Sequence, residues 1–279
     1  MRLPASKTFA FVFLTAIGII FVIPVFWILL ASFRLESELV AAGGFMLLPR
    51  TWTIENFTYI FDIGSVQSPI IRWFFNSVLV SGSFSILSVL IISMSAYAFS
   101  KLRFRGRDIL FLVLLFVSSF PAIVNLVPLY RIMLGLNWVN TPMALIFPGL
   151  AGVFNIFLVK QFMVGIPDSL IEAAKIDGGG EIRIYAKIIL PLAKPILTII
   201  AIFSFTGSWN DFLWPTIVMN NVENLTLTAG LQLALGQYEL YTSKLSAVSV
   251  VAIFPMVIFY FCLQRYLMRG VSISAGVKG

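Results

Sequence analysis

A short polar and aromatic segment in the last third of the chain carries side chains suited to binding a polyhydroxylated molecule. It reads SWNDFLW over residues 208–214. Aromatic rings bind the C–H faces of sugars, and amides and carboxylates bind their hydroxyls. A second interpretation places Trp209 and Trp214 in an interfacial aromatic belt and makes Asp211 the cap of a helix break. Both interpretations stay open from the sequence.

Polar side chains also recur inside apolar segments, where they are costly and tend to face protein or water. One group shares helical spacing: Ser77, Ser81, Ser85 and Ser88. Such a stripe either allows close helix packing or faces a pathway, and single amides in later segments either bridge helices or line a cavity. The candidates for a translocation pathway are Ser81, Ser85, Asn125, Asn155, Trp209, Asn210, Asp211 and Trp214.

The residues of most enzyme sites are missing. The chain has no His and a single Cys, Cys262, so no Cys/His zinc site and no His general base are expected. No G-x-x-x-x-G-K-[ST] motif occurs, and Glu181 after Gly178–Gly180 would repel a phosphate. No carboxylate pair has glycosidase spacing. We therefore expect no catalytic residue, no metal site and no cofactor in this chain.

The composition indicates that the apolar segments of the chain are surrounded by lipid. Of 279 residues, 59% are hydrophobic and 11% are charged, and the mean hydropathy is +0.99. A typical soluble domain has about 25% charged residues. The net charge of +7 fits basic cytoplasmic loops of a membrane protein better than a nucleic-acid surface. The chain is predicted to be an integral membrane protein that binds no nucleic acid.

Six windows almost free of charge are each long enough for a transmembrane helix of about 20 residues. They are Lys7–Arg34, Arg72–Lys101, Asp108–Arg131, Arg131–Lys160, Lys194–Glu223 and Lys244–Arg265. The fourth becomes apolar after Pro142, and Asp211 interrupts the fifth. The first is too long for a signal-peptide core and is expected to remain as an anchor. The predicted fold is all-α with six transmembrane helices.

Lys and Arg set the expected orientation. With a cytoplasmic N-terminus, 14 of them fall on inner segments and 5 on outer ones, which satisfies the positive-inside rule. Both termini are then cytoplasmic, in a multi-pass protein of the cytoplasmic membrane. The expected organisation is a first helix with an outer segment (1–71), a core of five helices (72–265) with a cytoplasmic loop (160–194), and a cytoplasmic tail (266–279).

The cytoplasmic loop predicts two short helices joined by glycines. Ser169 and Glu172 have the spacing of a capping box, which favours a helix over 170–177. Gly178–Gly180 end it, and a second helix is expected over 181–190, ending at Pro191. The resulting knob either inserts into a cleft of another protein or packs on its own spans.

The same loop resembles a known signature. Its residues fit E-A-A-x3-G-x9-I-x-L-P at every defined position: Glu172, Ala173, Ala174, Gly178, Ile188, Leu190 and Pro191. This is the EAA motif of ABC importer permeases. The flanks IPDSLIEAAKIDGGG and IILPLAKPIL are similar to the carbohydrate, maltose-type branch, and FSFTGSWNDFLWP with TLTAGL resembles its smaller membrane subunit. The resemblance extends from about Arg72 to Arg265, with GGG where many relatives carry G-A or G-C.

The resemblance implies a type I ABC importer permease fold and a function. Such a permease pairs with a second homologous permease subunit in the lipid bilayer, above two cytoplasmic ATPases that bind ATP and Mg. An extracytoplasmic sugar-binding protein delivers a di- or oligosaccharide. The seven motif residues would form the ATPase-coupling contacts, with the EAA loop forming the coupling helix.

Three alternatives remain beside this interpretation. One is a permease of the same family for glycerol-phosphate or another polyol. A second is a secondary transporter, for which Asp211 is the one candidate coupling group within the spans. A third is a structural scaffold, which the pathway residues leave open.

Overall fold

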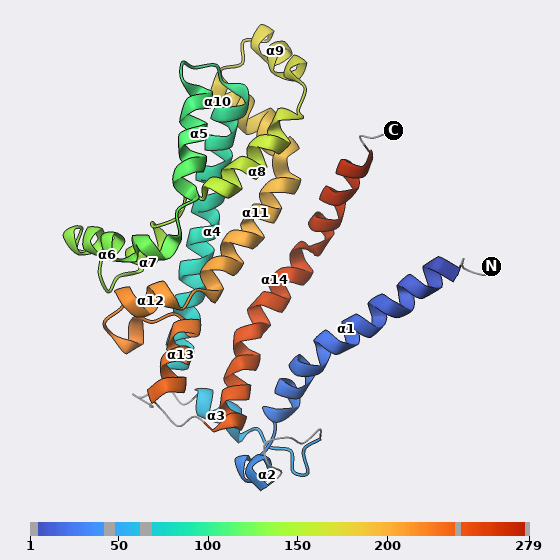
Figure 1. The fold of residues 1–279 in the computed structure, drawn as a ribbon, viewed down its shortest axis with the longest axis vertical. Coiled ribbons are helices and arrows are strands. Elements are labelled where there is room, and N and C mark those ends of the chain that lie inside the picture. The colour runs from blue at the N-terminus through green and yellow to red at the C-terminus, as the bar shows by residue number, and fades with distance from the viewer. Residues whose placement is uncertain (1–4, 42–47, 62–68, 238–240, 277–279) are drawn as a thin grey trace. The chain divides into compact units, whose positions relative to one another are not determined.

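The computed structural model describes residues 5–41, 48–61, 69–237 and 241–276, and every regular element within them is a helix (Figure 1). This confirms the all-α expectation. The chain divides into two compact units, residues 1–71 with 232–255 and residues 72–231 with 256–279.

Straight, apolar helices of membrane-spanning length occur at four places in the described residues: Thr8–Ala31, Ile70–Lys101, Glu181–Asn210 and Thr242–Cys262. Two further helix pairs meet the same requirements together but bend at a short break. Counting each bent pair as one span gives six among the described residues. The third and fourth predicted windows are therefore not single straight helices.

The third window breaks at a proline. Helix α5 (Arg107–Ser118) is followed by the 3-10 helix η1 (Ala122–Asn125) and α6 (Leu126–Gly135), at a bend of 90°. Pro121 lies in the break. A residue before proline avoids the helical conformation, so α5 ends ahead of it.

The fourth window contains α7 (Pro142–Ile146) and α8 (Val153–Val164). Gly149 separates them with φ of +81°, a conformation that L side chains rarely adopt. Helix α9 (Asp168–Ile176) follows α8 at a bend of 74°, after Gly165 and Pro167. The bend takes α9 out of the line of its span (Figure 1).

The second loop helix does not end at Pro191, contrary to the sequence prediction. Helix α10 (Glu181–Ile184) continues through a π-helical turn, η2 (Tyr185–Ile189), into α11 (Leu190–Asn210). A proline lacks an N–H and collides with the carbonyl of residue i−4. The wider π turn immediately before Pro191 accommodates both defects, so one helix connects the loop to the span.

The first unit contains α1 (Ala5–Ala31), α2 (Glu36–Ala41), α3 (Glu55–Phe61) and the beginning of α14 (Thr242–Gly276). The buried Asn56 amide donates hydrogen bonds to the carbonyls of Ser32 and Arg34 at 3.0 and 2.7 Å. Glu36 accepts hydrogen bonds from the backbone and hydroxyl of Ser243 at 2.8 and 2.6 Å. Side chains therefore connect the loop after α1 to α3 and α2 to α14.

The second unit is built around α4 (Ile70–Lys101) and α11. The hydroxyls of Ser81 and Ser208 lie 3.2 Å apart, and Ser85 donates to the Ala201 carbonyl at 2.8 Å, so the two helices run side by side (Figure 1). Their buried apolar faces form one core with α5, α8 and α9. The remaining elements are α12 (Leu213–Val218), η3 (Val222–Asn224) and α13 (Leu227–Gln237).

Candidate functional site

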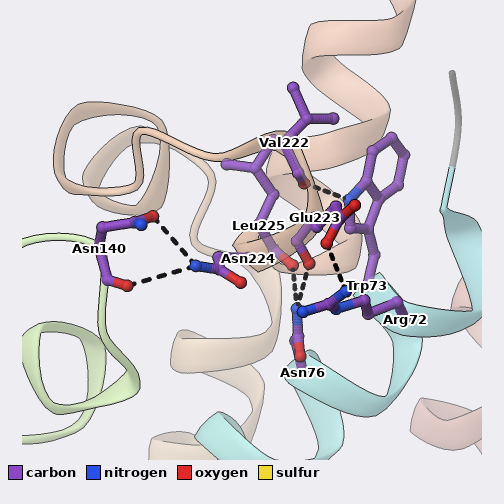
Figure 2. A network of polar contacts seen from close by, with 8 residues as sticks. All are labelled: Arg72, Trp73, Asn76, Asn140, Val222, Glu223, Asn224 and Leu225. Carbon is purple, nitrogen blue, oxygen red and sulfur yellow. Dashed lines mark hydrogen bonds and ion pairs between the residues drawn. The ribbon is translucent and has the colours of Figure 1, made fainter. Parts of the chain in front are cut away.

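A polar network fixes the segment between α12 and α13 (Figure 2). The Trp73 indole donates to the Val222 carbonyl at 2.6 Å, and the Asn76 amide donates to the carbonyls of Glu223 and Leu225 at 2.9 and 3.0 Å. Arg72 forms an ion pair with Glu223.

The same network reaches the loop before α7. The Asn224 amide donates to the backbone carbonyl and the side-chain oxygen of Asn140 at 3.3 and 3.2 Å (Figure 2). Asn140 itself has φ of +63°, a conformation that Asn adopts more readily than most residues. Together with the contacts of α4, these bonds connect the segment after α12 to α4 and to the loop before α7.

A cavity of about 250 Å³ lies between α4, α11, α12 and the segment from α7 to α8. Its walls combine apolar surfaces with hydroxyl, amide and carboxylate groups, and its lining residues include Phe84, Ser88, Asn155, Ser208, Asp211 and Trp214. This mixture is typical of a binding cavity in which a few polar groups orient a ligand.

Three of the predicted pathway residues border this cavity: Asn155, Asp211 and Trp214. The Asp211 carboxylate accepts a weak hydrogen bond from the backbone N–H of Trp214 at 3.4 Å, at the break between α11 and α12. The Trp214 indole donates to the Ala144 carbonyl at 2.8 Å. Asp211 thus borders the cavity while it also contacts the start of α12.

The structure does not bring Trp209, Asn210 or Asn125 to the cavity lining. Trp209 is 2% exposed and stacks on Phe205, with ring centroids 5.6 Å apart. Asn210 is exposed at the end of α11, and Asn125 is exposed on η1. Trp209 lies on α11 and Trp214 lies on α12 beyond the break, so two tryptophans of one short segment face different surroundings.

The serine stripe of α4 faces protein. Ser81 and Ser85 are buried and bonded to α11, and Ser77 accepts a hydrogen bond from the Leu227 N–H at 2.8 Å. Ser88 differs, because it lines the cavity and its buried Oγ has no hydrogen-bond partner within the described part of the chain. A buried hydroxyl without a partner is unfavourable and favours a polar occupant of the space beside it.

Helix α9 of the predicted knob ends in a Schellman motif. The Gly179 N–H donates to the Ala174 carbonyl at 2.8 Å, and the Gly178 N–H donates to the Lys175 carbonyl at 3.0 Å. Gly178 has φ of +77°, the left-handed conformation that this motif requires of its first residue past the cap. The predicted role of Gly178 in the turn therefore has a direct geometric basis.

The predicted capping box is wrong. Helix α9 begins at Asp168 with Pro167 as its N-cap, and no side chain caps it. Ser169 therefore lies inside the helix. The Asp168 carboxylate instead accepts a hydrogen bond from the Lys101 ammonium at 2.6 Å. That bond and the positive charge of Lys101 lower the pKa of the Asp168 carboxyl, so this ion pair is charged at neutral pH.

The two faces of α9 have different surroundings. Ile171 is buried in the core of the second unit, and Ala174 packs against that core. On the other side, Glu172 and Ala173 are exposed, and Ile176 is 87% exposed. One side of the helix thus packs on its own spans, and the opposite side offers small and apolar groups.

Ile182 is a surface residue that sequence reasoning missed. It lies just after the glycine turn and is 85% exposed. Side chains two residues apart on a helix point in different directions, so Ile182 is exposed while Ile184 is buried. Together, Ile176 and Ile182 form an apolar pair on either side of Gly178–Gly180.

The last motif residues lie on the connecting helix rather than on α9. Ile188 belongs to the π turn η2, and Leu190 and Pro191 begin α11. Their neighbour Ile189 is fully buried in the core. These positions therefore shape the continuous helix between the knob and the cavity wall.

Comparison with protein families gives a match over residues 88–273, to the family described as "Binding-protein-dependent transport system inner membrane component". This range includes the knob and every residue named as lining the cavity except Phe84.

Curated relatives match almost the whole chain. The arabinooligosaccharides transport system permease protein AraQ of Halalkalibacterium halodurans is 38% identical, over 94% of this chain and 93% of its own length. The galactooligosaccharides transport system permease protein GanQ of Bacillus subtilis is 31% identical, over 97% and 95%. The diacetylchitobiose uptake system permease protein NgcG of Streptomyces coelicolor is 31% identical, over 91% and 84%.

Among solved structures, the fold is similar to a chain in the crystal structure of a bacterial ABC transporter involved in the import of the acidic polysaccharide alginate. The TM-score is 0.80 with 23% sequence identity, over 95% of this chain and 99% of that one. At this identity the likeness concerns the fold.

Proposed function

Because the chain belongs to the family of inner membrane components of binding-protein-dependent transport systems, we propose that it is the permease subunit through which a di- or oligosaccharide enters the cell. The observation that carries this proposal is the near full-length similarity to permeases named for arabino- and galactooligosaccharides. The chain supplies the path across the cytoplasmic membrane. ATP hydrolysis on separate subunits supplies the energy.

The cytoplasmic knob is the proposed docking element for an ATPase. Its outward side presents exposed Ala173, Ile176 and Ile182, which give apolar anchors and room for close approach. Glu172 on the same side is the proposed partner of a basic group on the ATPase. This arrangement supports a complex of two ATPases, this chain, a second permease subunit and an external sugar-binding protein.

The cavity beside α11 is proposed as part of the sugar route. Asn155 and Asp211 offer an amide and a carboxylate, and Ser88 offers a hydroxyl that has no hydrogen-bond partner among the described residues. These groups match the hydroxyls of a sugar, while Phe84 and Trp214 supply apolar wall. In this proposal Trp209 has a structural role, because it packs against Phe205 within the helix bundle.

Transport in proteoliposomes tests the proposal. The chain is reconstituted with the second permease, the ATPase and the binding protein encoded beside it. Labelled arabino-, galacto-, malto- and chito-oligosaccharides and glycerol 3-phosphate are offered outside, with ATP inside. We expect uptake of an oligosaccharide that requires both ATP and the binding protein. Uptake of glycerol 3-phosphate alone would favour the polyol alternative, and uptake driven by an ion gradient without ATPase would contradict the proposal.

A further inference from the structure

The cytoplasmic end of α4 contacts the chain on both sides of α9. At the start of α9, the Lys101 ammonium donates to the Ile166 carbonyl and to the carboxylate of Asp168, the first residue of the helix, both at 2.6 Å. After the glycine turn, the Tyr97 hydroxyl donates to the Glu181 carboxylate at 2.7 Å. One helix therefore contacts the segment that enters α9 and the segment that leaves it.

These contacts belong to one face of α4. Ser93, Tyr97 and Lys101 are spaced four residues apart, which places them above one another on a helix. The Ser93 and Tyr185 hydroxyls lie 2.7 Å apart, so the stripe also bonds the π turn η2. The other oxygen of Glu181 forms an ion pair with Lys175 of α9 at 2.7 Å. The polar contacts thus link α4 to α9, α10 and η2.

The α4 side of each contact is buried. The Lys101 side chain is 4% exposed, Tyr97 is 5% exposed and Ser93 is 1% exposed. Hydrogen bonds and charge pairs are stronger away from water, and a buried group that loses its partner is unfavourable. These contacts therefore hold α9 in one position relative to α4.

The same helix also forms a wall of the cavity. Phe84, Ser88 and Ile92 of α4 line it. At 1.5 Å per residue, Lys101 lies about 20 Å along the helix from Ser88. A continuous helix transmits a displacement along this length. Pro167 and the Gly178–Gly180 turn are the points at which α9 would otherwise pivot alone.

We infer that Ser93, Tyr97 and Lys101 are positioning residues that fix the knob to α4, so that a displacement of α9 moves the cavity wall with it. This inference rests on the proposed function, in which an ATPase displaces α9. The stripe makes α4 the mechanical link between docking and the sugar route. None of the three residues needs to touch the ATPase or the sugar.

A distance measurement in the assembled transporter tests the inference. Cys262→Ser removes the native thiol, and spin labels are attached at Ser169→Cys on α9 and Met94→Cys, 53% exposed, on α4. Distances are recorded without nucleotide and with ATP and vanadate. We expect one narrow distribution that is the same in both states. With Tyr97→Phe and Lys101→Met combined, we expect the distribution to broaden and to shift by several ångströms with ATP and vanadate.

Ser100→Ala is the matched control, because the Ser100 hydroxyl bonds only the Tyr97 carbonyl of its own helix among the interactions described. It should behave as the unmodified protein does. A nucleotide-dependent shift in the unmodified protein, or an unchanged distribution in the combined variant, would overturn the inference. Failure of the ATPase to copurify with the unmodified chain would instead contradict the proposed function.

Tyr97→Phe alone provides a second test that removes one oxygen and keeps the ring. In proteoliposomes it should increase the ATP hydrolysed per oligosaccharide imported by about twofold or more, while ATPase copurification stays normal. Glu181→Gln should add little to that change, because both variants weaken the same contact. Unchanged stoichiometry in Tyr97→Phe would count against the role of this bond in coupling.

Discussion

Three consecutive glycines after α9 meet different local requirements. Gly178 has φ of +77°, and a Cβ at Gly179 would lie 2.7 Å from the Ala174 carbonyl oxygen. A Cβ at Gly180 would meet nothing within 4 Å. The first position therefore needs glycine for its backbone conformation, the second is crowded by a carbonyl, and the third accepts a side chain.

Gly178→Asp should uncouple transport while the protein remains inserted. It places an L residue in the left-handed region at roughly 1–2 kcal/mol. We expect uptake to fall at least tenfold, measured per inserted permease. Gly180→Ala is the matched control and should transport normally. Normal uptake by Gly178→Asp would contradict the assignment of this turn to coupling.

Ser88→Ala should weaken sugar transport without loss of stability. Ser88→Ala removes no hydrogen bond among the described residues, whereas Ser85→Ala removes the hydrogen bond to the Ala201 carbonyl. A hydrogen bond of about 1 kcal/mol corresponds to a roughly fivefold effect. We expect a KM for uptake raised about fivefold in Ser88→Ala. Ser85→Ala should lower the thermal unfolding temperature and leave KM near normal, and the reverse pattern would remove Ser88 from the route.

At the scale of elements, α13 can approach α4 closely because one of its residues has no side chain. A Cβ at Gly230 would lie 2.3 Å from Cδ2 of Trp73. Trp73 is 1% exposed, and its indole is bonded to the Val222 carbonyl. The tryptophan therefore has little freedom to move away, and the glycine determines how α13 packs.

Gly230→Ala should destabilise the second unit. Overpacking in a filled core costs about 1–3 kcal/mol, so we expect a lower unfolding temperature. Tryptophan fluorescence of the protein in detergent measures this temperature. In a Trp73→Leu background, Gly230→Ala should lower the unfolding temperature less than it does in the unmodified protein. Gly82→Ala is the control, since a Cβ there meets nothing within 4 Å. Equal stability of Gly230→Ala and Gly82→Ala would contradict the packing seen here.

At the scale of the whole molecule, the distribution of Lys and Arg predicts which side faces the cytoplasm. The assignment of 14 basic residues to inner segments and 5 to outer ones places the knob inside the cell. It places the segment around Asn221 outside. This orientation is a prediction that docking to a cytoplasmic ATPase requires.

Cysteine accessibility in intact cells measures the orientation. In a Cys262→Ser background, Asn221→Cys should react with a membrane-impermeant maleimide added outside. Ser169→Cys should react only after the membrane is permeabilised. Both positions are exposed in the structure. A lack of reaction therefore means that the membrane keeps the maleimide from the cysteine, and not that the cysteine is buried. Labelling of Ser169→Cys in sealed cells would reverse the proposed topology.

The sequence by itself determined the apolar spans, the helical class and the glycine turn of the loop. These features follow from local causes, namely runs of apolar residues long enough for a bilayer and residues with unusual backbone preferences. Gly178 could be assigned its turn in this way. The motif also names Glu172 and Ala173, which the structure exposes on the side of α9 proposed for docking.

Only the tertiary structure decided which neighbours each polar residue has. Helix α9 begins at Asp168, which bonds Lys101, one residue before the predicted cap Ser169, and a π turn carries the helix through Pro191. Within one short segment, Trp214 borders the cavity whereas Trp209 packs on Phe205. These outcomes depend on contacts between residues far apart in the chain, because packing and partner choice are set by where helices meet rather than by local preference.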